Sequence, residues 1–442
     1  MKPDLGKVKS VPVSHPINAS KHVVSLGVVV ALLFGAHASG QTATQDTPHD
    51  TREARWLQDL NYFADQFPKR EKDFKKLYPR QEFENRLAAI RQSVSKATDS
   101  EVILDLYRLV ASAHVGHTRV ASPSGDIAFH MLPLSMNWFS DGLAIVAAID
   151  AYKDALGTRV LRIGSMTPDQ LEAAVAPYIS YENETWLHVQ SPSFMVMAEL
   201  LQHLGLTGTD GSVELLLAKA DGTEFKKAVF PVAAGDAAQQ VIIYDALPIP
   251  LPLYRKQPGK YYWYEYLSDL QTLYIQYNVC ENDPKLPFAE FTKAMFEYAD
   301  AHPIERAIVD LRLNGGGNST VIKPLEKGLH ARRALSRRGH LYTLIGPGTF
   351  SSGLWAAIDL RHKGAILVGE PPGEKPNSYG EVKVLTLPNS HVGVRYSTKF
   401  FKLDKKNDAS ALAPDIFVPR PLADVLAGRD PVLEAAVKHP LN

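Results

Sequence analysis

Strands and helices alternate over the last third of the chain, and this alternation constrains the fold more than any other feature of the sequence. Apolar runs of strand length occur at 272–277, 307–311, 341–345 and 365–368. A helix-like segment follows the first run, because large apolar side chains recur there at three- and four-residue spacing (Phe288, Phe291, Met295, Tyr298). Repeated alternation of this kind predicts an α/β core with a largely parallel sheet.

The region before this core begins with helical patterns that continue to residue 113. The clearest helix opens with a capping box, in which Thr98 and Glu101 each satisfy a backbone N–H of the other. Apolar residues then follow on one face, and the helix ends before Gly116. We therefore expect an N-terminal helical segment.

From about residue 127 to 234 the pattern changes to short strands with one or two helices. One helix is predicted to start at Pro168 with Thr167 as its cap, and a hairpin is predicted to turn at 220–222. Prolines at 248, 250, 252 and 258 then exclude a helix or a central strand. The sequence thus predicts a compact mixed module followed by a linker.

The first forty residues have the layout of a secretory signal peptide. Four lysines precede an apolar run of 13 residues at 23–35, and Ala36 and Ala38 supply small residues for cleavage. A bilayer-spanning helix needs about 20 apolar residues, which favours a cleaved leader over an uncleaved anchor. We expect export to the periplasm or the medium, a mature chain that begins near Ser39, and no stable membrane span after the leader is removed.

The charge balance and the cysteine content limit which partners and which covalent cross-links the chain can have. The chain has 48 basic and 48 acidic side chains, so its balance indicates no nucleic-acid partner. Cys280 is the single cysteine, which excludes an intramolecular disulfide. The exported protein therefore has to be stabilised by its core alone.

A glycine-rich turn precedes the helix that follows the 341–345 strand. Residues 346–353 read GPGTFSSG, which places Ser351 and Ser352 between a strand and a helix. A serine at such a turn exposes its hydroxyl at the sheet edge, and the helix start offers free N–H groups to an oxyanion. The competing interpretation is that one of the two serines simply caps the helix.

Three consecutive glycines, Gly315, Gly316 and Gly317, follow the 307–311 strand within the run DLRLNGGGN. They permit unusual backbone angles and the close approach of a ligand, so their N–H groups could complete an oxyanion hole or bind the substrate backbone. A phosphate-binding loop is a weak alternative, because no Gly-Lys-Ser/Thr follows. A plain flexible loop also remains open.

Two histidines, His114 and His117, lie three residues apart at the end of the last N-terminal helix. A metal site is not favoured, because no third ligand has suitable spacing and Gly116 interrupts the helix. His117 is either a structural or a catalytic histidine. We predict no metal and no cofactor.

Together these elements resemble the C-terminal processing (tail-specific) serine peptidases with a tricorn-type core. The resemblance runs from about Trp56 to the C-terminus and rests on VGHT at 115–118, DLRLNGGG at 310–317, TFSS at 349–352 and VGE at 368–370. It implies a ClpP/crotonase-like β/α core with an N-terminal helical segment and a PDZ-like module, and it places the nucleophile at Ser351. The implied divisions are a signal peptide (1–38), helices (39–125), the module (126–235), a linker (236–260) and the core (261–442).

The chain departs from the family pattern at several positions. Val115 stands where the family has an aspartate, and Leu354 where an acidic residue often follows the nucleophile. Lys375 lies 24 residues after Ser351 (375 − 351), close to the family spacing for a lysine base, although the pattern around it is altered. Tricorn-like members use a histidine, which corresponds to His117. We favour Lys375 slightly and keep both.

The resemblance implies an exported serine peptidase that acts on peptides or proteins by acyl transfer. Ser351 would attack the carbonyl, and the oxyanion would be held by the N–H of Ser352 and of a glycine among 315–317. The PDZ-like module would bind peptide by strand addition. The alternative is a non-catalytic peptide- or ligand-binding protein on the same fold, and an esterase is a further, smaller possibility.

Overall fold

The computed structural model describes residues 51–405 and 408–441 of the chain. The predicted leader and its cleavage site lie outside the described residues. Within the described part, no helix combines the length and the apolar character needed to cross a bilayer.

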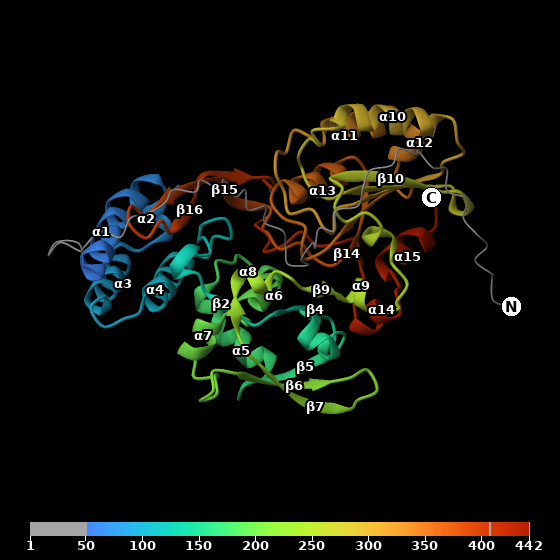
Figure 1. Cartoon of the computed structure of the whole chain (residues 1–442). Coiled ribbons are helices and arrows are strands. Elements are labelled where there is room, and N and C mark those ends of the chain that lie inside the picture. The colour runs from blue at the N-terminus through green and yellow to red at the C-terminus, as the bar shows by residue number, and fades with distance from the viewer. Residues whose placement is uncertain (1–50, 406–407, 442) are drawn as a thin grey trace.

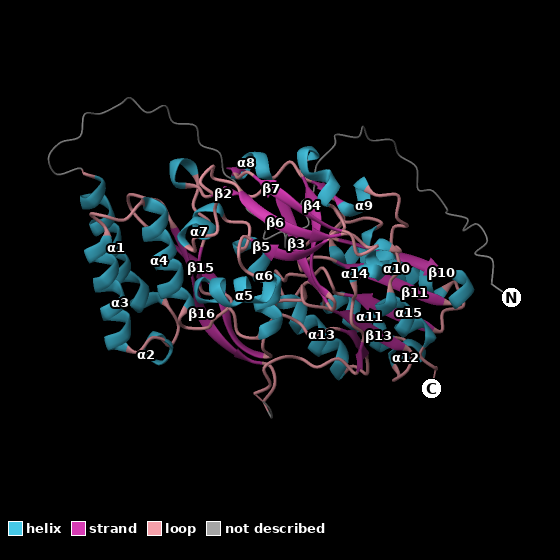
Figure 2. Cartoon of the chain, turned by 90° about the horizontal axis from the view of Figure 1, so that it is seen from below, coloured by secondary structure: helices cyan, strands magenta, loops and turns pink. Residues whose placement is uncertain are grey.

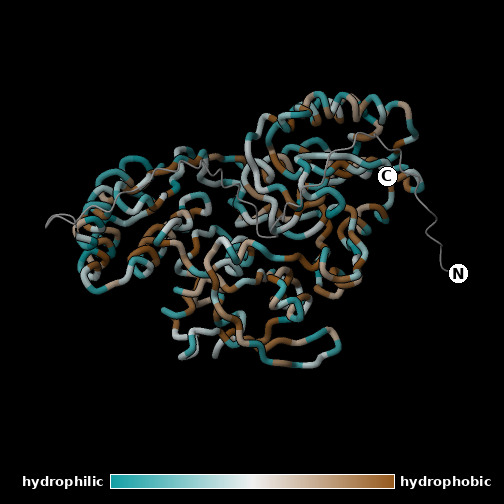
Figure 3. The backbone as a smooth tube through the Cα atoms, in the orientation of Figure 1, coloured by the Kyte–Doolittle hydropathy of each residue, from teal (hydrophilic) through white to brown (hydrophobic). Residues whose placement is uncertain are grey.

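Four helices form the N-terminal layer, drawn in blue in Figure 1. They are α1 (Arg52–Arg70), α2 (Phe74–Leu77), α3 (Arg80–Ser93) and α4 (Asp99–Ala111). The predicted capping box is confirmed, since Thr98 and Glu101 exchange both side chain–backbone hydrogen bonds. Figure 3 shows hydrophobic and hydrophilic positions alternating along these helices, as expected of helices with one buried face. Stacked rings such as Phe63 and Phe67 fill the space between them.

The middle of the chain forms a mixed module around an antiparallel sheet of order β3-β4-β5-β6-β7, with β9 paired to β4. The strands are β3 (Leu134–Phe139), β4 (Gly142–Ala148), β5 (Arg159–Ile163), β6 (Val213–Ala218), β7 (Glu224–Val229) and β9 (Val241–Ile242). Its helices are α5 (Pro168–Val175), α6 (Glu184–Phe194), α7 (Ala198–His203), α8 (Ala234–Ala237) and α9 (Ile243–Ala246). A separate two-stranded sheet is formed by β2 (His130–Met131) and β8 (Val232–Ala233). Thr167 caps α5 as predicted. Because β9 pairs with β4, the module extends past residue 235, where the linker was expected to begin.

The C-terminal part contains a six-stranded sheet of order β10-β11-β12-β13-β14-β17. The strands are β10 (Tyr262–Leu267), β11 (Thr272–Tyr277), β12 (Arg306–Asp310), β13 (Leu341–Ile345), β14 (Ile366–Gly369) and β17 (Ile416–Phe417). Only β10 is antiparallel to its neighbour, which confirms the predicted parallel core.

Helices cover both faces of this sheet. They are α10 (Phe288–Asp300), α11 (Lys323–Ala331), α12 (Arg333–Ser336), α13 (Ser352–His362), α14 (Leu422–Leu426) and α15 (Pro431–Lys438). Alternate strand residues point to opposite faces, so Val309 packs in the cluster of α10, α11 and α13, whereas Ile308 packs in the cluster of α15. Figure 1 shows α10 and α11 above the sheet and α15 below it.

A long hairpin leaves the core and reaches back to the N-terminal helices, as Figures 1 and 2 both show. Its strands, β15 (Asn377–Thr386) and β16 (Gly393–Lys402), form a three-stranded sheet with β1 (Arg119–Val120). Leu385 and Val394 belong to the same hydrophobic cluster as α1–α4. This hairpin was not predicted from the sequence. It matters for the site because it joins the segment after His117 to the segment after Lys375.

Candidate active site

Ser351 lies where the turn after β13 enters α13. Its backbone angles, φ 51° and ψ −127°, fall in a region that costs a residue with a side chain about 1–3 kcal/mol. The turn is fixed by Thr349, whose hydroxyl donates to the Leu311 carbonyl (2.9 Å), and by Phe350, whose N–H donates to the Asn314 carbonyl (3.0 Å). Ser351 occupies the N-cap position, yet its hydroxyl makes no capping hydrogen bond. The simple N-cap interpretation therefore does not account for Ser351, and its hydroxyl is left for chemistry.

The predicted glycine loop packs directly against this serine. Gly316 has φ +112°, and a methyl group on its α-carbon would lie 2.6 Å from Ser351 Cβ and 3.1 Å from Ser351 Oγ. Position 316 therefore requires glycine for both conformation and space. The Gly316 N–H donates to Asn314 Oδ1 (3.0 Å), so this N–H is not free to bind an oxyanion.

The other predicted oxyanion groups fall into two kinds. The Ser352 N–H belongs to the first turn of α13, where N–H groups have no acceptor within the helix. The Ser352 hydroxyl instead donates to the Gly317 carbonyl (2.7 Å), which ties the glycine loop to the helix. Gly317 has φ +129° and lies tightly against the Cys280 backbone, whereas no atom lies within 4 Å of a methyl group built on Gly315. The structure thus brings Ser352 and the glycine loop to Ser351, as predicted.

His117 lies in the turn between α4 and β1, next to Phe350 of the Ser351 turn. Its ring packs on the Phe350 ring, with centroids 4.7 Å apart, and its side chain is 12% exposed. Burial, followed by the positive charges of Arg119 and Arg395, lowers the pKa of His117 to about 4. The imidazole is therefore neutral at neutral pH and can accept a proton.

Glu374, which was not predicted from the sequence, lies between the Ser351 backbone and His117. Its side chain is buried, and it accepts hydrogen bonds from the Ser351 N–H (2.5 Å) and the Ser378 hydroxyl (2.7 Å). His117 Nδ1 lies 3.4 Å from Glu374 Oε1, without the geometry of a hydrogen bond. Burial, followed by the negative charge of Glu182, raises the pKa of Glu374 to about 8. A carboxyl group thus contacts the backbone of Ser351 and faces the histidine.

The mixed module contributes a second carboxyl group, that of Glu182. It accepts hydrogen bonds from the Gly116 N–H (3.1 Å) and the Lys375 N–H (3.4 Å), so it ties the histidine turn to the Glu374 loop. Burial raises the pKa of Glu182 to about 7. Trp186, four residues further on, stacks on the Phe350 ring with centroids 4.0 Å apart. The site is therefore assembled from the N-terminal helices, the module and the core.

Comparison with known proteins identifies the fold. No protein-family model matches the sequence, and no curated protein is significantly similar to it. Among solved structures, mature CPAF is 13% identical, with a TM-score of 0.58 over 87% of this chain and 96% of its own. A CPAF mutant gives 14% identity and a TM-score of 0.60 over the same shares. The photosystem II D1 C-terminal processing protease is 12% identical, with a TM-score of 0.42 over 87% of this chain and 97% of its own.

The chain has the fold of mature CPAF. Its fold is mixed α/β, with N-terminal helices, a mixed module and a largely parallel core sheet, as the sequence predicted. At this low sequence identity the similarity establishes the fold alone. The chemistry of the site has to be inferred from the residues of this chain.

Two of the departures from the family pattern are buried apolar positions. Val115 is 2% exposed and Leu354 is fully buried among the core residues beside α13. Neither position could hold a carboxylate facing solvent. Glu182 and Glu374 supply carboxyl groups next to the histidine turn and the serine from other parts of the chain.

Lys375 lies at this site through its backbone. Its side chain is half-buried and forms no hydrogen bond or ion pair with residues 51–405 or 408–441. Its charge favours the ionised form of Glu182. Contacts within the described chain thus bring His117 and Glu374 to the Ser351 turn, whereas Lys375 is joined to the site by its backbone N–H, which donates to Glu182.

The remaining predicted residue, His114, points elsewhere. Its side chain is exposed and its ring packs edge-on against Tyr181. Among the residues that the structure describes, no three histidine, cysteine or acidic side chains are placed to hold a metal ion.

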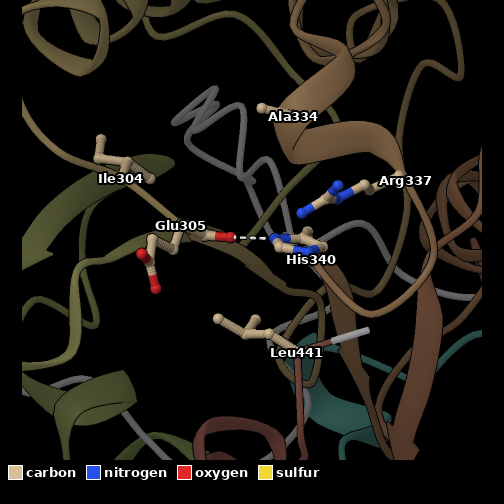
Figure 4. Close-up of a pocket in the computed structure, with 6 residues that line it drawn as sticks. All are labelled: Ile304, Glu305, Ala334, Arg337, His340 and Leu441. Carbon is tan, nitrogen blue, oxygen red and sulfur yellow. Dashed lines mark hydrogen bonds between the residues drawn. The ribbon is translucent and has the colours of Figure 1, made fainter.

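A separate cavity of about 290 Å³ lies at the opposite edge of the core sheet (Figure 4). Glu305 and His340, which line it, immediately precede β12 and β13, and the His340 ring hydrogen-bonds the Glu305 carbonyl (2.6 Å). Ser351 follows the carboxyl end of β13, so this cavity is not part of the candidate site.

Proposed function

We propose that this chain is a serine peptidase that cleaves peptide bonds by acyl transfer, with Ser351 as the nucleophile. The observation that carries the proposal is the conformation of Ser351. The backbone of Ser351 is strained, and Gly316 packs so closely against it that no larger residue fits at position 316. The Ser351 hydroxyl makes no hydrogen bond that caps α13. Strain of this kind persists where the surrounding structure enforces it, and it concentrates at functional sites.

In the proposed reaction, Ser351 Oγ gives its proton to the Nε2 atom of neutral His117 and bonds to the substrate carbonyl carbon. The oxyanion is stabilised by the Ser352 N–H at the start of α13. The C–N bond then breaks, and His117 returns the proton to the leaving amine. Water attacks the acyl ester with His117 again as the base, which releases the acid and restores Ser351.

We assign the base to His117 and not to Lys375. The imidazole packs beside the Ser351 turn and faces Glu374, whose ionised form would stabilise the imidazolium. The Lys375 ammonium has no contact that directs it to Ser351 within the described chain. This choice reverses the slight preference that the sequence spacing gave.

A fluorophosphonate probe tests the nucleophile, because it labels activated serines. The mature chain should be labelled on Ser351, and Ser351→Ala should lose labelling and peptide hydrolysis while keeping the wild-type circular dichroism spectrum. Ser352→Ala is the matched control, since it removes a hydroxyl that binds Gly317 and keeps the N–H. Labelling lost only in Ser352→Ala would move the nucleophile by one residue.

The second candidate is a non-catalytic peptide-binding protein on the same fold. It is favoured by the 3.4 Å separation between His117 Nδ1 and Glu374, which falls short of a hydrogen bond. Absence of labelling and of hydrolysis, together with retained peptide binding, would support this candidate over the enzyme.

We also propose that the chain is exported and that its leader is removed after Ala38. The support is the charged start, the short apolar run and the small residues at 36 and 38. Intact-mass measurement of protein from an exporting host should show a chain that begins near Ser39. A full-length product in the membrane fraction would contradict export with cleavage.

A further inference from the structure

Trp186, in the first turn of α6 of the mixed module, is buried against three separate segments of the candidate site. Its indole stacks on the Phe350 ring, with centroids 4.0 Å apart and an interplanar angle of 14°. A methyl group built on Gly116 would lie 3.4 Å from the indole Nε1, and one built on Gly373 would lie 2.4 Å from the indole Cε3. A single side chain, which is 2% exposed, therefore packs against all three segments.

The three residues that surround this indole have one property in common. Each immediately precedes a group of the candidate site: Phe350 before Ser351, Gly116 before His117 and Gly373 before Glu374. Neighbouring residues share a planar peptide unit, so a shift of one of these backbones also shifts the residue that follows it. The indole is thus placed to set the separations between the nucleophile, the base and the buried carboxyl group.

The Phe350 ring extends the contact of the indole to the base. Besides stacking on Trp186, this ring packs on the His117 imidazole, with centroids 4.7 Å apart. The Phe350 N–H donates to the Asn314 carbonyl (3.0 Å), so the backbone of this residue is fixed as well. The imidazole therefore rests on a ring that the indole holds in place.

The start of α6 is itself anchored to the rest of the site. Asn183 Oδ1 accepts the Trp186 N–H (2.8 Å) and caps the helix, while Asn183 Nδ2 donates to the Ser410 carbonyl (2.9 Å). Glu182, one residue earlier, accepts the Gly116 N–H (3.1 Å). Trp186 thus reaches the site from a helix end that hydrogen bonds hold against it.

The choice of tryptophan at this position carries a cost. Within residues 51–405 and 408–441, the indole Nε1 is buried and has no hydrogen-bond partner. A buried donor without a partner is destabilising, and phenylalanine would stack on Phe350 without that penalty. The larger ring system, which reaches Gly116 and Gly373 at once, is the simplest reason for the presence of Trp186.

We propose that Trp186 is a positioning residue, which holds the nucleophile, the base and the buried carboxyl group in their reactive arrangement. It acts through the residues that precede these groups and does not touch the reacting atoms. This inference rests on the proposed peptidase function of Ser351, and it adds a residue of the mixed module to the parts on which that function depends.

Steady-state hydrolysis of one peptide by the mature protein tests this role. Trp186→Leu should lower kcat about 10²-fold and change KM by less than about threefold, because a small displacement of reacting groups impairs the chemical step more than binding. Trp186→Phe keeps the stack on Phe350 and should lose only about 10-fold. Trp138→Leu is the matched control, since Trp138 bonds to Ser191 further along the same helix, and its kcat should stay within about twofold of wild type.

The ionisation of His117 provides a readout that needs no catalysis. Burial, followed by the positive charges of Arg119 and Arg395, lowers the pKa of His117 to about 4, and Glu374 Oε1 faces the ring at 3.4 Å. Removal of the indole would let water reach the imidazole, and hydration raises the pKa of a buried histidine.

NMR of the protein labelled with ¹³C-histidine measures this effect, with His117→Asn to assign the signal. Wild-type His117 should stay neutral between about pH 5.5 and 8. In Trp186→Leu it should titrate within this range, because its pKa moves toward the ordinary value of 6.5. In Trp138→Leu it should behave as in the wild type.

The outcomes separate the positioning role from the peptidase function. If the wild type cleaves no peptide, the peptidase proposal fails, while a His117 pKa that rises only in Trp186→Leu still supports the positioning role. A Trp186→Leu kcat within about threefold of wild type, with an unchanged titration, would overturn the role and leave the peptidase intact. An equal loss of kcat in Trp138→Leu would also overturn it. If melting curves show that Trp186→Leu does not fold, Trp186→Phe takes its place, and wild-type kcat in that variant would overturn the role.

Discussion

The serine half and the histidine half of the candidate site are built in different ways. The serine half comes from β12, β13, α13 and their loops, which pack together as consecutive parts of one parallel sheet. Backbone hydrogen bonds and close glycine contacts fix it, with Gly316 against Ser351 and the Ser352 hydroxyl on the Gly317 carbonyl. These contacts involve backbone groups, glycines and a hydroxyl, and no ionisable side chain takes part in them.

The histidine half is assembled from three segments that are far apart in the sequence. His117 follows α4, Glu182 comes from the module, and Glu374 precedes the hairpin. Its properties are electrostatic, because burial lowers the pKa of His117 to about 4 and raises that of Glu374 to about 8. At neutral pH both groups are therefore largely uncharged. The comparison indicates a nucleophile side that is fixed mainly by backbone contacts and a base side whose properties depend on protonation.

The largest expected effect on activity concerns the general base, for which His117 and Lys375 are the two candidates. His117→Asn should lower kcat/KM by about 10²–10⁴-fold, because it removes the proton acceptor and keeps a polar side chain of similar size. Lys375→Met should cost less than about 10-fold, because the lysine side chain makes no contact that the site needs. Steady-state hydrolysis of one peptide by both variants is the measurement. An inactive Lys375→Met beside an active His117→Asn would restore the lysine base.

The rigidity of the serine half can be broken with one methyl group. Gly316→Ala would place Cβ 2.6 Å from Ser351 Cβ at φ +112°, so the Ser351 turn has to shift. Displacing the nucleophile and the Ser352 N–H together should cost about 10²–10³-fold in kcat at every pH.

Gly346→Ala is the matched control in the same region. A methyl group there would meet Arg312 Cγ at 3.6 Å, which is an ordinary contact, and activity should stay within about twofold of wild type. If Gly316→Ala were as active as Gly346→Ala, the serine half would be more adaptable than its contacts indicate.

The serine half could be predicted from the sequence because its signals are local. A strand, a glycine turn and a helix at 341–362 fix where Ser351 lies, and a second strand followed by three glycines fixes the loop beside it. Parallel order follows from the alternation of strands and helices, so both loops had to meet at one sheet edge.

The histidine half could not be predicted in the same way. Nothing local in the stretch that contains Glu374 indicates that this glutamate is buried, since its burial depends on the module and on the hairpin that follows it. The hairpin itself was missed because its interior side chains, such as Leu385 and Val394, pack against helices some 300 residues earlier in the chain. Two charged residues, Glu374 and Lys375, lie between Gly373 and Pro376, and the family spacing points to Lys375 rather than to Glu374.

The pH dependence of activity tests whether the histidine half of the site depends on protonation. The ionised form of Glu374 stabilises the imidazolium, and its pKa of about 8 means that this form appears only as the pH rises through 8. Wild-type kcat/KM should therefore increase over that range. Glu374→Gln should remove this rise and lower the high-pH value by about 10-fold.

Glu182→Gln serves as the partner variant for this experiment. It removes the negative charge that raises the pKa of Glu374, so the rise in activity should move to lower pH. A wild-type profile that is flat between pH 6 and 9 would show that Glu374 does not control the base.

The smallest expected effect concerns stability, and it tests whether buried carboxyl groups outside the site behave as those inside it do. Glu71 is 4% exposed, and burial raises its pKa to about 7, above the ordinary value of 4.5. A raised carboxyl pKa contributes stability that is present below pH 4.5 and is lost as the pH rises through 7, at no more than about 1.4 kcal/mol per pH unit. The wild-type melting temperature should therefore fall between pH 5 and 8, and Glu71→Gln, which stays neutral, should fall by roughly 2 °C less. Glu84→Gln, on the exposed face of α3, should follow the wild type. Equal slopes for wild type and Glu71→Gln would mean that Glu71 ionises without penalty, and that strong electrostatic effects of burial are confined to the histidine half of the site.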